Sequence, residues 1–431
     1  MRYSLLSCFL FFTMRLLAAG DSIPDYYSNG IQFKDKEYAK NIATVQLSPD
    51  PNQLLPAIIK LNSGDKLYLS FDDLDADKKD YYYSFVHCTS DWKETNIMPS
   101  EFIDGFATNP ISSYNYSGVT IQRYTHYNVA FPNDDVKFLT SGNYILKVFL
   151  DNDDSKIMIT RRFMVAEEMM SVDMNVHAAT VVADRNFKQE VDFSINYPTD
   201  EVGNPYSQIT PVILQNNNWT TAITGLQPQF VNNGQLVYDY DDVNVFRGGS
   251  EFRHADLRSL RVQSEHVQSI QRDSVNNYNV YLMPDDRRTY KRYVNMNDIN
   301  GKFLIKTYDA GNSDVDGEYA YVHFFLPWDP PATEGELYVY GALTDWQYKP
   351  EAKMKYNAAL KGYEATLYLK QGYYNYEYVL ASDKNPLPDD QFVEGMHYET
   401  ENDYTVVVYY RKQGSWIDQI VAIKTMNTRT F

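Results

Sequence analysis

A histidine and a cysteine that are neighbours in the chain are the first candidates for chemistry. A cysteine nucleophile needs its base across a hydrogen bond, and His87 directly precedes Cys88. Adjacent residues of a strand point to opposite faces of the sheet, and the preceding run Tyr81–Tyr83 favours a strand here. The pair is therefore badly arranged for catalysis, and we expect Cys88 to be a buried structural cysteine.

Clustered carboxylates are the second candidate, because calcium binds clustered oxygen ligands. The cluster consists of Asp72, Asp73, Asp75, Asp77 and Asp80. This segment lacks the glycine and the terminal glutamate of an EF-hand loop, so we expect a solvated acidic turn. A carboxylate pair for glycoside hydrolysis stays open as a third-ranked interpretation, because 57 acidic residues allow many combinations.

Other motifs for metal or catalytic chemistry are missing from the sequence. The seven histidines are scattered, and there is no HExxH, GxSxG or P-loop motif. We therefore predict no catalytic residue, no metal and no cofactor.

Two clusters combine aromatic and polar side chains and could form a recognition surface. One is Tyr124–Tyr127, and the other is Phe246–Arg253, which includes two glycines. Tyrosine and arginine are frequent interface anchors, although strand ends and a glycine turn with an Arg–Glu pair would explain the same residues. The predicted binding residues are Tyr81, Tyr82, Tyr83, Trp92, Tyr124, His126, Tyr127, Glu251, Phe252, Arg253 and Trp346.

The charge balance of the chain excludes some classes of binding partner. The 431 residues include 57 acidic and 39 basic side chains, which gives a formal net charge of −18. This balance argues against nucleic acid and anionic lipid surfaces, since both attract positive charge. The 38 tyrosines favour pleated strands and wet interfaces.

The first twenty residues have the features of a secretory signal peptide. Arg2 precedes an apolar run from Leu5 to Met14, and Leu17–Ala19 ends in small residues, although Arg15 interrupts the pattern. The apolar run is too short to span a bilayer, and no later segment is long enough. We therefore expect an exported, soluble protein without direct membrane insertion, in which Cys88 has no disulfide partner.

Alternation of apolar and polar residues is the main periodic signal, as in Val191–Tyr197 and in Tyr374, Tyr376 and Tyr378. Phe252–Ile270 is the best helical candidate, with a strand as the alternative for the same segment. Asn300–Gly301 is typical of a hairpin turn. The pattern predicts an all-β fold of tandem antiparallel β-sandwich domains.

We expect three domains after the signal peptide of residues 1–20. They comprise residues 35–168, residues 170–326, which are β-rich, and residues 333–431. The boundary near 168 is soft, whereas Pro327–Pro331 has the composition of a stiff linker.

A long ordered set of strings resembles one known family. It includes Ser70–Leu74, Tyr81–Cys88, Glu101–Phe106 and Thr160–Val165, then Gln189–Phe193 and Gly248–Arg253, and finally Leu343–Trp346 and Lys370–Tyr376. The chain resembles the plug protein of the type IX secretion system from about Asp35 to Arg411.

This resemblance implies a periplasmic, non-enzymatic protein whose partner is the outer-membrane β-barrel translocon. Members of the family close the periplasmic mouth of that pore. The resemblance carries over no residue-level role.

The last domain is also similar to the early-set immunoglobulin-like domains of glycogen- and starch-active proteins, through Tyr338–Trp346 and Leu369–Tyr376. In glycan-binding members exposed aromatic rings stack on sugars. We expect Trp346 to fill the sandwich core, with sugar stacking as the alternative. An exported glycan-binding protein, with a glycan at this C-terminal domain, is thus the second functional hypothesis.

Overall fold

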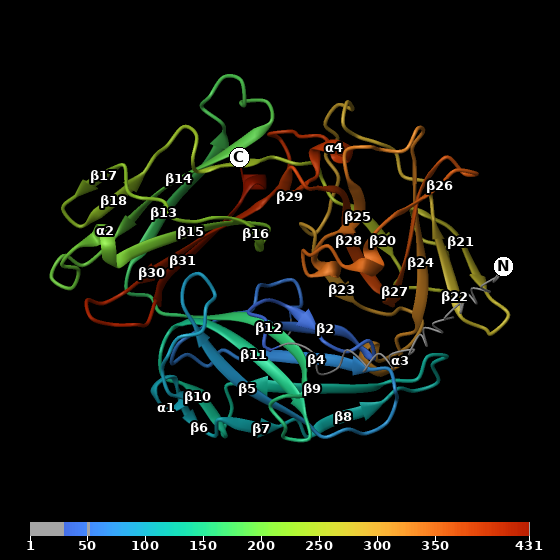
Figure 1. Ribbon diagram of the computed structural model, residues 1–431, viewed down its shortest axis with the longest axis horizontal. Coiled ribbons are helices and arrows are strands. Elements are labelled where there is room, and N and C mark those ends of the chain that lie inside the picture. The colour runs from blue at the N-terminus through green and yellow to red at the C-terminus, as the bar shows by residue number, and fades with distance from the viewer. Residues whose placement is uncertain (1–29, 50–51, 431) are drawn as a thin grey trace, which may run out of the picture.

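The computed structural model describes residues 30–49 and 52–430 (Figure 1). The expected signal peptide, residues 1–20, lies outside the described residues. Of the described residues, 47% are in strands and 6% in helices, and the sheets are predominantly antiparallel, which confirms the predicted all-β fold. Three groups of sheets surround three main hydrophobic cores, and we call them the first, middle and third domains.

The first domain comprises residues 30–169. Its strands are β1 (Lys36–Glu37), β2 (Ile42–Pro49), β3 (Ile58–Lys60), β4 (Leu67–Asp73), β5 (Tyr81–Cys88), β6 (Ile103–Gly105), β7 (Thr108–Pro110), β8 (Ser113–Tyr116), β9 (Thr125–Phe131), β10 (Val136–Phe138), β11 (Gly142–Leu150) and β12 (Ile157–Ala166), with helix α1 (Pro99–Phe102). The sheet β2-β4-β9-β8 and the strands β12-β11-β5-β7 contribute to one core. Side chains that alternate along each strand fill this core, as expected for a sandwich.

The middle domain combines residues 170–250 with residues 399–430. Its elements are β13 (Ser171–Ala178), β14 (Lys188–Asn196), β15 (Ile209–Gln215), β16 (Asn218–Ile223), β17 (Phe230–Asn232), β18 (Gln235–Tyr238), β19 (Val245–Arg247), β30 (Asp403–Tyr410) and β31 (Gln419–Asn427), with α2 (Pro205–Gln208) and the 3₁₀ helix η4 (Thr428–Thr430). One core joins residues of β13, β14 and β18 with residues of β15, β30 and β31.

The third domain comprises residues 251–398. Its strands are β20 (Arg253–Asp256), β21 (Val267–Arg272), β22 (Tyr278–Leu282), β23 (Phe303–Ile305), β24 (Tyr319–Pro327), β25 (Glu336–Tyr340), β26 (Lys355–Asn357), β27 (Gly362–Lys370), β28 (Gly372–Ser382) and β29 (Asn385–Asp389). Its short helices are α3 (Ser313–Asp316), α4 (Gln391–Glu394), η2 (Ala342–Thr344) and η3 (Pro350–Ala352). The sheet β21-β22-β24-β27-β26 faces strands that pair around β28.

The cores divide the later part of the chain differently from the expected domains 170–326 and 333–431. Strand β24 pairs with β27, so residues on both sides of the expected linker share one sheet. Trp328, inside that segment, is buried in the core of the third domain. Strands β30 and β31 return to the middle domain, where β30 pairs with β15. The third domain is therefore an insertion within the middle domain.

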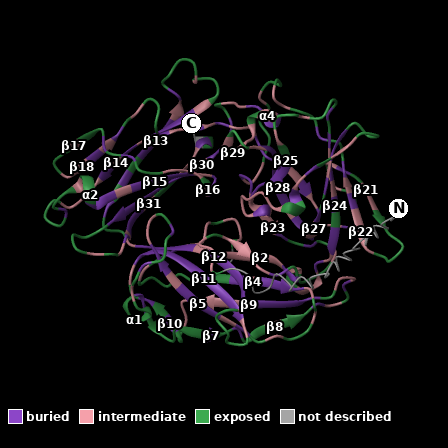
Figure 2. Ribbon diagram, viewed as in Figure 1, coloured by how far each residue is buried: buried purple, intermediate pink, exposed green. Residues whose placement is uncertain are grey.

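One sheet of ten strands continues from the first domain into the middle domain, in the order β16-β15-β30-β31-β12-β11-β5-β7 with β1 and β3 beside β12. The link is a parallel pairing of Ala166 with Ile420. On β30, Val406 and Val408 enter the middle core, whereas Val407 and Tyr409 enter a cluster shared with the first domain. Figure 2 shows these strands as largely buried. The two domains are thus joined by backbone and by packing.

Two local expectations have different outcomes. Of the helix and the strand considered for Phe252–Ile270, the helix is wrong, because this segment contains β20 and the start of β21, which belong to different sheets. The turn expected at Asn300–Gly301 is confirmed, since φ is 53° at Asn300 and 75° at Gly301, and glycine adopts such angles without strain. The residues before this turn are not a strand, however, so it does not close a hairpin.

Candidate functional site

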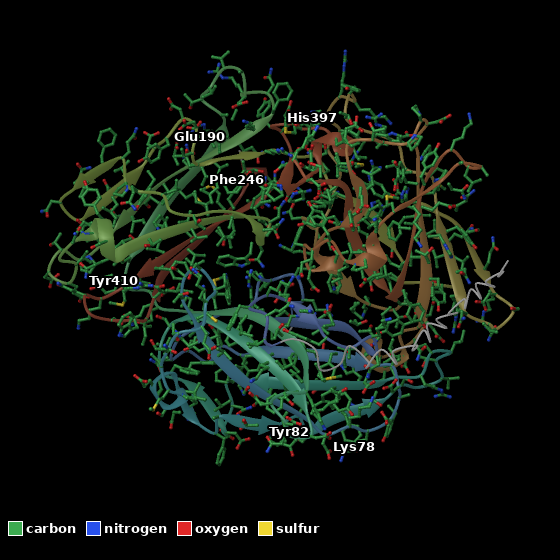
Figure 3. All side chains as sticks on the ribbon, in the orientation of Figure 1. Lys78, Tyr82, Glu190, Phe246, His397 and Tyr410 are labelled. Atoms are coloured by element: carbon green, nitrogen blue, oxygen red, sulfur yellow. The ribbon has the colours of Figure 1, made fainter. Side chains whose placement is uncertain are left out.

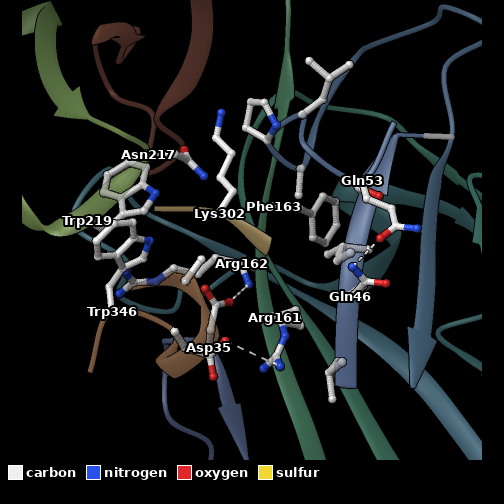
Figure 4. Close-up of a pocket in the computed structure, with 18 of the residues that line it drawn as sticks. Asp35, Gln46, Gln53, Arg161, Arg162, Phe163, Asn217, Trp219, Lys302 and Trp346 are labelled. Carbon is white, nitrogen blue, oxygen red and sulfur yellow. Dashed lines mark hydrogen bonds and ion pairs between the residues drawn. The ribbon is translucent and has the colours of Figure 1, made fainter. Parts of the chain in front are cut away.

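Side chains from all three domains line one pocket of about 180 Å³ (Figure 4). Its main lining residues are Asp35, Arg161 and Arg162 of the first domain, Trp219 of the middle domain, and Asp345 and Trp346 of the third domain. Because its walls belong to different domains, this junction pocket exists only while the domains remain in contact.

An ion-pair network beside the junction pocket connects the first and third domains, and two of its members, Arg161 and Asp345, line the pocket. Lys349 Nζ lies 2.8 Å from Glu37 Oε2 and 2.6 Å from Asp345 Oδ2. Arg161 forms a close ion pair with Glu37 and lies 3.7 Å from Asp345 Oδ1. Buried charges of this kind are tolerated because each has an opposite charge beside it.

The charges in this network reinforce one another. Burial acts to raise the pKa of Glu37, but Arg161 and Lys349 outweigh it and lower the pKa well below its usual range. Burial likewise opposes the charge of Lys349, yet Asp345 and Glu37 raise its pKa. Asp35 behaves differently, because burial raises its pKa despite the nearby Arg161. The Glu37–Lys349 contact thus stays charged at neutral pH.

Two tryptophans form the aromatic wall of the junction pocket, and the guanidinium group of Arg162 packs against both. The guanidinium carbon of Arg162 lies 4.5 Å from the ring centroid of Trp92 and 5.9 Å from that of Trp219. The two indoles meet edge to face with centroids 5.0 Å apart. Arg162 also donates to the carbonyl oxygen of Phe33 at 2.9 and 2.6 Å. Cation–π contacts therefore connect the first and middle domains.

A second buried ion pair joins the first and third domains. Lys370 Nζ lies 2.7 Å from Asp72 Oδ2, which also accepts a hydrogen bond of 2.7 Å from the hydroxyl of Tyr319. His126 Nδ1 lies 2.7 Å from the other carboxylate oxygen of Asp72. Burial lowers the pKa of Lys370, and Asp72 opposes that shift. Lys370 Nζ also lies 4.2 Å from the ring centroid of Tyr124.

Most of the predicted binding residues lie in the interior. The buried ones are Tyr81, Tyr83, Trp92, Tyr124, His126, Tyr127, Glu251, Phe252 and Arg253, whereas Tyr82 and Trp346 are partly exposed. Figure 3 labels Tyr82 on the first domain. A buried side chain cannot meet a partner in this conformation, so the predicted recognition surface has no support at these nine positions.

The buried tyrosines of the first domain have hydroxyl partners inside the protein. Tyr81 donates to Asp73 Oδ2 at 2.8 Å, and Tyr124 donates to the carbonyl of Gly317 at 3.0 Å. Tyr127 accepts a hydrogen bond of 2.7 Å from the backbone N–H of Lys79. Buried tyrosines usually find such partners. These tyrosines are therefore packed strand residues and not a recognition surface.

The second predicted cluster is a core of charges rather than a surface. Arg253 does not pair with Glu251, as the sequence suggested, but with Asp285 at 2.8 Å and Glu394 at 2.9 Å. Glu251 instead accepts a hydrogen bond from the hydroxyl of Tyr293. Burial acts against the charge of Asp285, but Arg253 keeps its pKa well below the usual range. These partners are distant in sequence, which is why local spacing missed them.

The acidic run is only partly a solvated turn. Asp72 and Asp73 are fully buried, so the expectation is wrong for these two residues. The ammonium group of Lys79 lies 2.7 Å from Asp73, 2.5 Å from Asp75 and 3.2 Å from Asp77. These three aspartates could otherwise hold a metal ion. Lys79 already supplies the positive charge at that position.

The second possible metal cluster, His177, Glu190 and Asp192, also has internal partners. His177 Nε2 lies 2.7 Å from Asp192 Oδ2, and Glu190 accepts a hydrogen bond of 2.7 Å from the backbone N–H of Thr180. The imidazole and the carboxylates therefore pair with one another or with the backbone.

Cys88 is a buried cysteine, as expected. Burial raises the pKa of its thiol to about 12. Its sulfur donates to the carbonyl of Val86 at 3.7 Å, whereas His87 Nδ1 lies 3.0 Å from Thr95 Oγ1. The thiol and the imidazole thus have different partners, as the alternation of strand β5 predicts.

The junction pocket contains residues that the sequence analysis missed, chiefly Arg161, Arg162 and Trp219. One signal was present for the two arginines. They interrupt an otherwise apolar strand, and consecutive strand residues face opposite sides. Arginines inside a central strand must therefore find a partner on each face.

Comparison with known proteins assigns the first domain to a family. Residues 42–167, from β2 to the end of β12, match the family described as "Type 9 secretion system plug protein 1st domain". The first domain belongs to the type 9 secretion system plug domain family. Membership gives this plug-family chain a role related to type IX secretion.

A solved structure matches the plug-family chain over nearly its whole length. This hypothetical protein from Parabacteroides merdae ATCC 43184 is 31% identical, with a TM-score of 0.88, and the match covers 92% of this chain and 100% of that chain. Trypsin-activated alpha-2-macroglobulin from Escherichia coli is 10% identical with a TM-score of 0.17, and the match covers 89% of this chain and 23% of that one. A score this low supports no inference about the protein. No curated protein matches.

Within residues 30–49 and 52–430 of the plug-family chain, no helix has the length and hydropathy of a membrane span.

Proposed function

We propose that the protein is a periplasmic plug that closes the periplasmic opening of the outer-membrane translocon of type IX secretion. It acts sterically, through protein–protein contacts, and not as an enzyme. The observation that carries this proposal is the family membership of residues 42–167. The expectation of export by an N-terminal signal peptide agrees with this location.

The contacts among the domains support a steric role, because a protein that blocks a pore must keep its domain arrangement while it does so. The first and middle domains share a sheet, and two sets of buried ion pairs connect the first and third domains. Removing one partner of a buried ion pair costs about 3–5 kcal/mol. The three domains therefore resist separation and present one continuous body to a partner.

The charge of the chain supports a protein partner with a basic rim. A formal net charge of −18 steers association with positive surfaces, and salt screens that attraction. A specific and stable complex would bury at least about 1,000 Å².

The test is recovery of the translocon on the immobilised full chain from gently solubilised outer membranes. We expect a large β-barrel protein in the eluate, identified by mass spectrometry, with recovery that falls as salt rises from low to high concentration. An immobilised acidic β-sandwich protein of similar charge is the matched control. Equal recovery on the control, or no large barrel protein at low salt, would count against the proposal.

Glycan binding is the second candidate, favoured by the position of Trp346. This side chain packs beside Tyr340 but stays partly exposed and lines two pockets, so it is not wholly in the core as expected. A glycan-binding chain would be retarded in gels that contain soluble polysaccharide, and Trp346→Ala would remove the retardation while the fold persists. Unchanged migration across a broad polysaccharide panel would eliminate this candidate.

A further inference from the structure

A second pocket, of about 420 Å³, lies between the middle and third domains. The side chains that matter for its chemistry are Thr220 and Arg247 of the middle domain and Trp346, Glu377 and Asp390 of the third domain. Phe246, which is labelled in Figure 3, also lines it. We call it the interdomain pocket. It shares only part of its lining, including Trp346, with the junction pocket.

Of the four charged side chains that line the interdomain pocket, three have partners. Lys188 Nζ lies 2.9 Å from the carboxylate of Asp184, and Arg247 Nη1 lies 3.2 Å from Asp390 Oδ1. Glu377 differs, because its carboxyl group forms no hydrogen bond or ion pair with any residue that the structure describes. The pocket therefore contains one acidic group without a partner.

The strand that carries Glu377 explains why its carboxyl group faces the pocket. On β28, Tyr376 and Tyr378 are fully buried in the core of the third domain, and side chains alternate along a strand. Glu377 therefore points to the opposite face. It pairs in register with Tyr340 of β25, so its backbone is held within the sheet. The side chain keeps some exposed surface.

The surroundings of Glu377 are acidic. Burial is the main cause that raises its pKa well above the ordinary value, and Asp390, Glu394 and Asp298 add to the shift, whereas Arg288 opposes it. Arg288 itself lies 2.7 Å from Glu394. The charge environment therefore disfavours an anionic ligand and favours a positive one.

The lining distinguishes among possible cations. A single free carboxyl group beside an indole is a poor shell for calcium or magnesium, which require several oxygen ligands. Organic cations suit this combination, since guanidinium and ammonium groups bind both carboxylates and aromatic faces. The pocket wall already holds such a group, because the guanidinium of Arg247 lies 3.0 Å from Asp389 and 3.2 Å from Asp390.

We propose that the interdomain pocket binds a guanidinium or ammonium group, with Glu377 as its counter-ion and Trp346 as an aromatic wall. Entry of the cation favours the ionised carboxylate of Glu377, so any proton that this carboxyl group carries is released to solvent and the bound pair is neutral. This proposal deepens the proposed function. It rests on that function because a partner protein would supply the cation as an arginine or lysine side chain. A free small cation would present the same chemistry.

The experiment is calorimetric titration of the full chain at pH 7 with three probes. N-acetyl-arginine amide represents a side chain within a polypeptide, methylguanidinium represents a free cation, and N-acetyl-citrulline amide is the neutral analogue. We expect N-acetyl-arginine amide to bind at least tenfold more tightly than the citrulline analogue. Buffers of different ionisation enthalpy should reveal release of up to one proton for each cation bound.

Variants then assign the binding to the pocket. Glu377→Gln should weaken binding of N-acetyl-arginine amide at least tenfold and abolish proton release. Glu336→Gln, which changes an exposed glutamate of the same domain, should leave both unchanged. If Glu377→Gln does not fold, the comparison of arginine with citrulline probes on the wild-type chain still tests the proposal.

The outcomes separate the sources and the two proposals. Binding of N-acetyl-arginine amide without methylguanidinium supports a polypeptide side chain, and binding of both supports a free cation. Equal affinity for the arginine and citrulline probes, or equal binding by Glu377→Gln, overturns the proposal. Recovery of the translocon from membrane extracts is measured separately, so failure of the plug function is recognised independently of failure of the pocket.

Discussion

Eleven of the twelve largest fully buried side chains are tyrosines. Each brings a hydroxyl group that needs a partner, and some of these partners lie in another domain. The hydroxyl of Tyr409, in the middle domain, donates to Asn143 Oδ1 of the first domain at 2.9 Å. Many of the tyrosines are therefore interior residues, which specify how strands and domains meet.

His87 should make the protein less stable in acid. Its side chain is buried, and burial lowers its pKa to about 4 from 6.5. The unfolded chain takes up the proton at higher pH, so the free energy of unfolding falls as pH decreases from about 6.5 to about 4, by about 3 kcal/mol. Urea denaturation at pH 4.5 and 7.5 should show a smaller pH effect in His87→Gln than in the wild type.

His177 provides the control of opposite sign. The hydrogen bonds of its ring to Ala178 and Asp192 raise its pKa against the opposing effect of burial. Its stabilising contribution is present in acid and is lost as pH rises through the folded pKa. His177→Gln should therefore steepen the loss of stability in acid, whereas His87→Gln reduces it. Identical pH effects in the wild type and His87→Gln would contradict the assignment.

At the scale of elements, alternation predicts strands well where one face is buried and the other is not. Val191–Tyr197 lies almost entirely in β14, and Tyr374, Tyr376 and Tyr378 lie on β28. Over Phe252–Ile270 the helical interpretation failed. Leu257 and Leu260 lie in the loop after β20, Val267 begins β21, and all three side chains enter one core. Period alone does not reveal which sheet a strand joins.

The candidate site was predictable only in part. Trp92 and Trp346 were singled out, and both line the junction pocket. The ion pair of Glu37 with Lys349 connects residues 312 positions apart, so no local spacing indicates it. Local sequence also does not indicate that β30 and β31 return to the middle domain. The proline-rich segment around Trp328 has the composition of a linker, although it lies within one domain.

Removal of the last two strands should open the middle domain alone. A chain that ends at residue 400 lacks β30 and β31, and with them Tyr404, Val406 and Val408 of the middle core. We expect hydrogen exchange to show loss of protection in residues 170–246 and retained protection in residues 255–393. Loss of protection mainly in residues 333–393 would favour the domain boundaries expected from the sequence instead.

At the scale of the whole molecule, each domain contacts the other two (Figure 1). The first and middle domains share the ten-stranded sheet, and the first and third are joined by Asp72–Lys370. The middle and third domains are joined by the ion pair of Lys302 with Asp403 at 3.0 Å. Contacts around a closed triangle support one another, because no domain can turn without breaking two interfaces.

Lys370→Met should loosen this arrangement. It leaves Asp72 buried without its ammonium partner, so we expect a loss of about 3–5 kcal/mol in the free energy of unfolding, measured by urea denaturation. The double variant Asp72→Asn/Lys370→Met should recover most of the loss, because no uncompensated charge remains. Small-angle scattering should show a larger radius of gyration for the single variant than for the wild type.

The matched control is Lys353→Met, which removes a lysine whose ion pair with Glu336 is exposed. Exposed pairs contribute at most about 1 kcal/mol, so this variant should resemble the wild type. If Lys370→Met were as mild as Lys353→Met, the buried pair would not stabilise the contact between the domains.

The insertion of the third domain into the middle domain has a consequence for maturation. A chain delivered from its N-terminus can complete the first and third domains before β30 and β31 arrive. Pairing of β15 with β30 then closes a loop of 189 residues between Gln215 and Tyr404, and contacts of such long range form slowly. Until then β15 has an unpaired edge that invites wrong partners. Arrival of the C-terminal strands is thus a completion signal, and the final shape exists only once the entire chain is present.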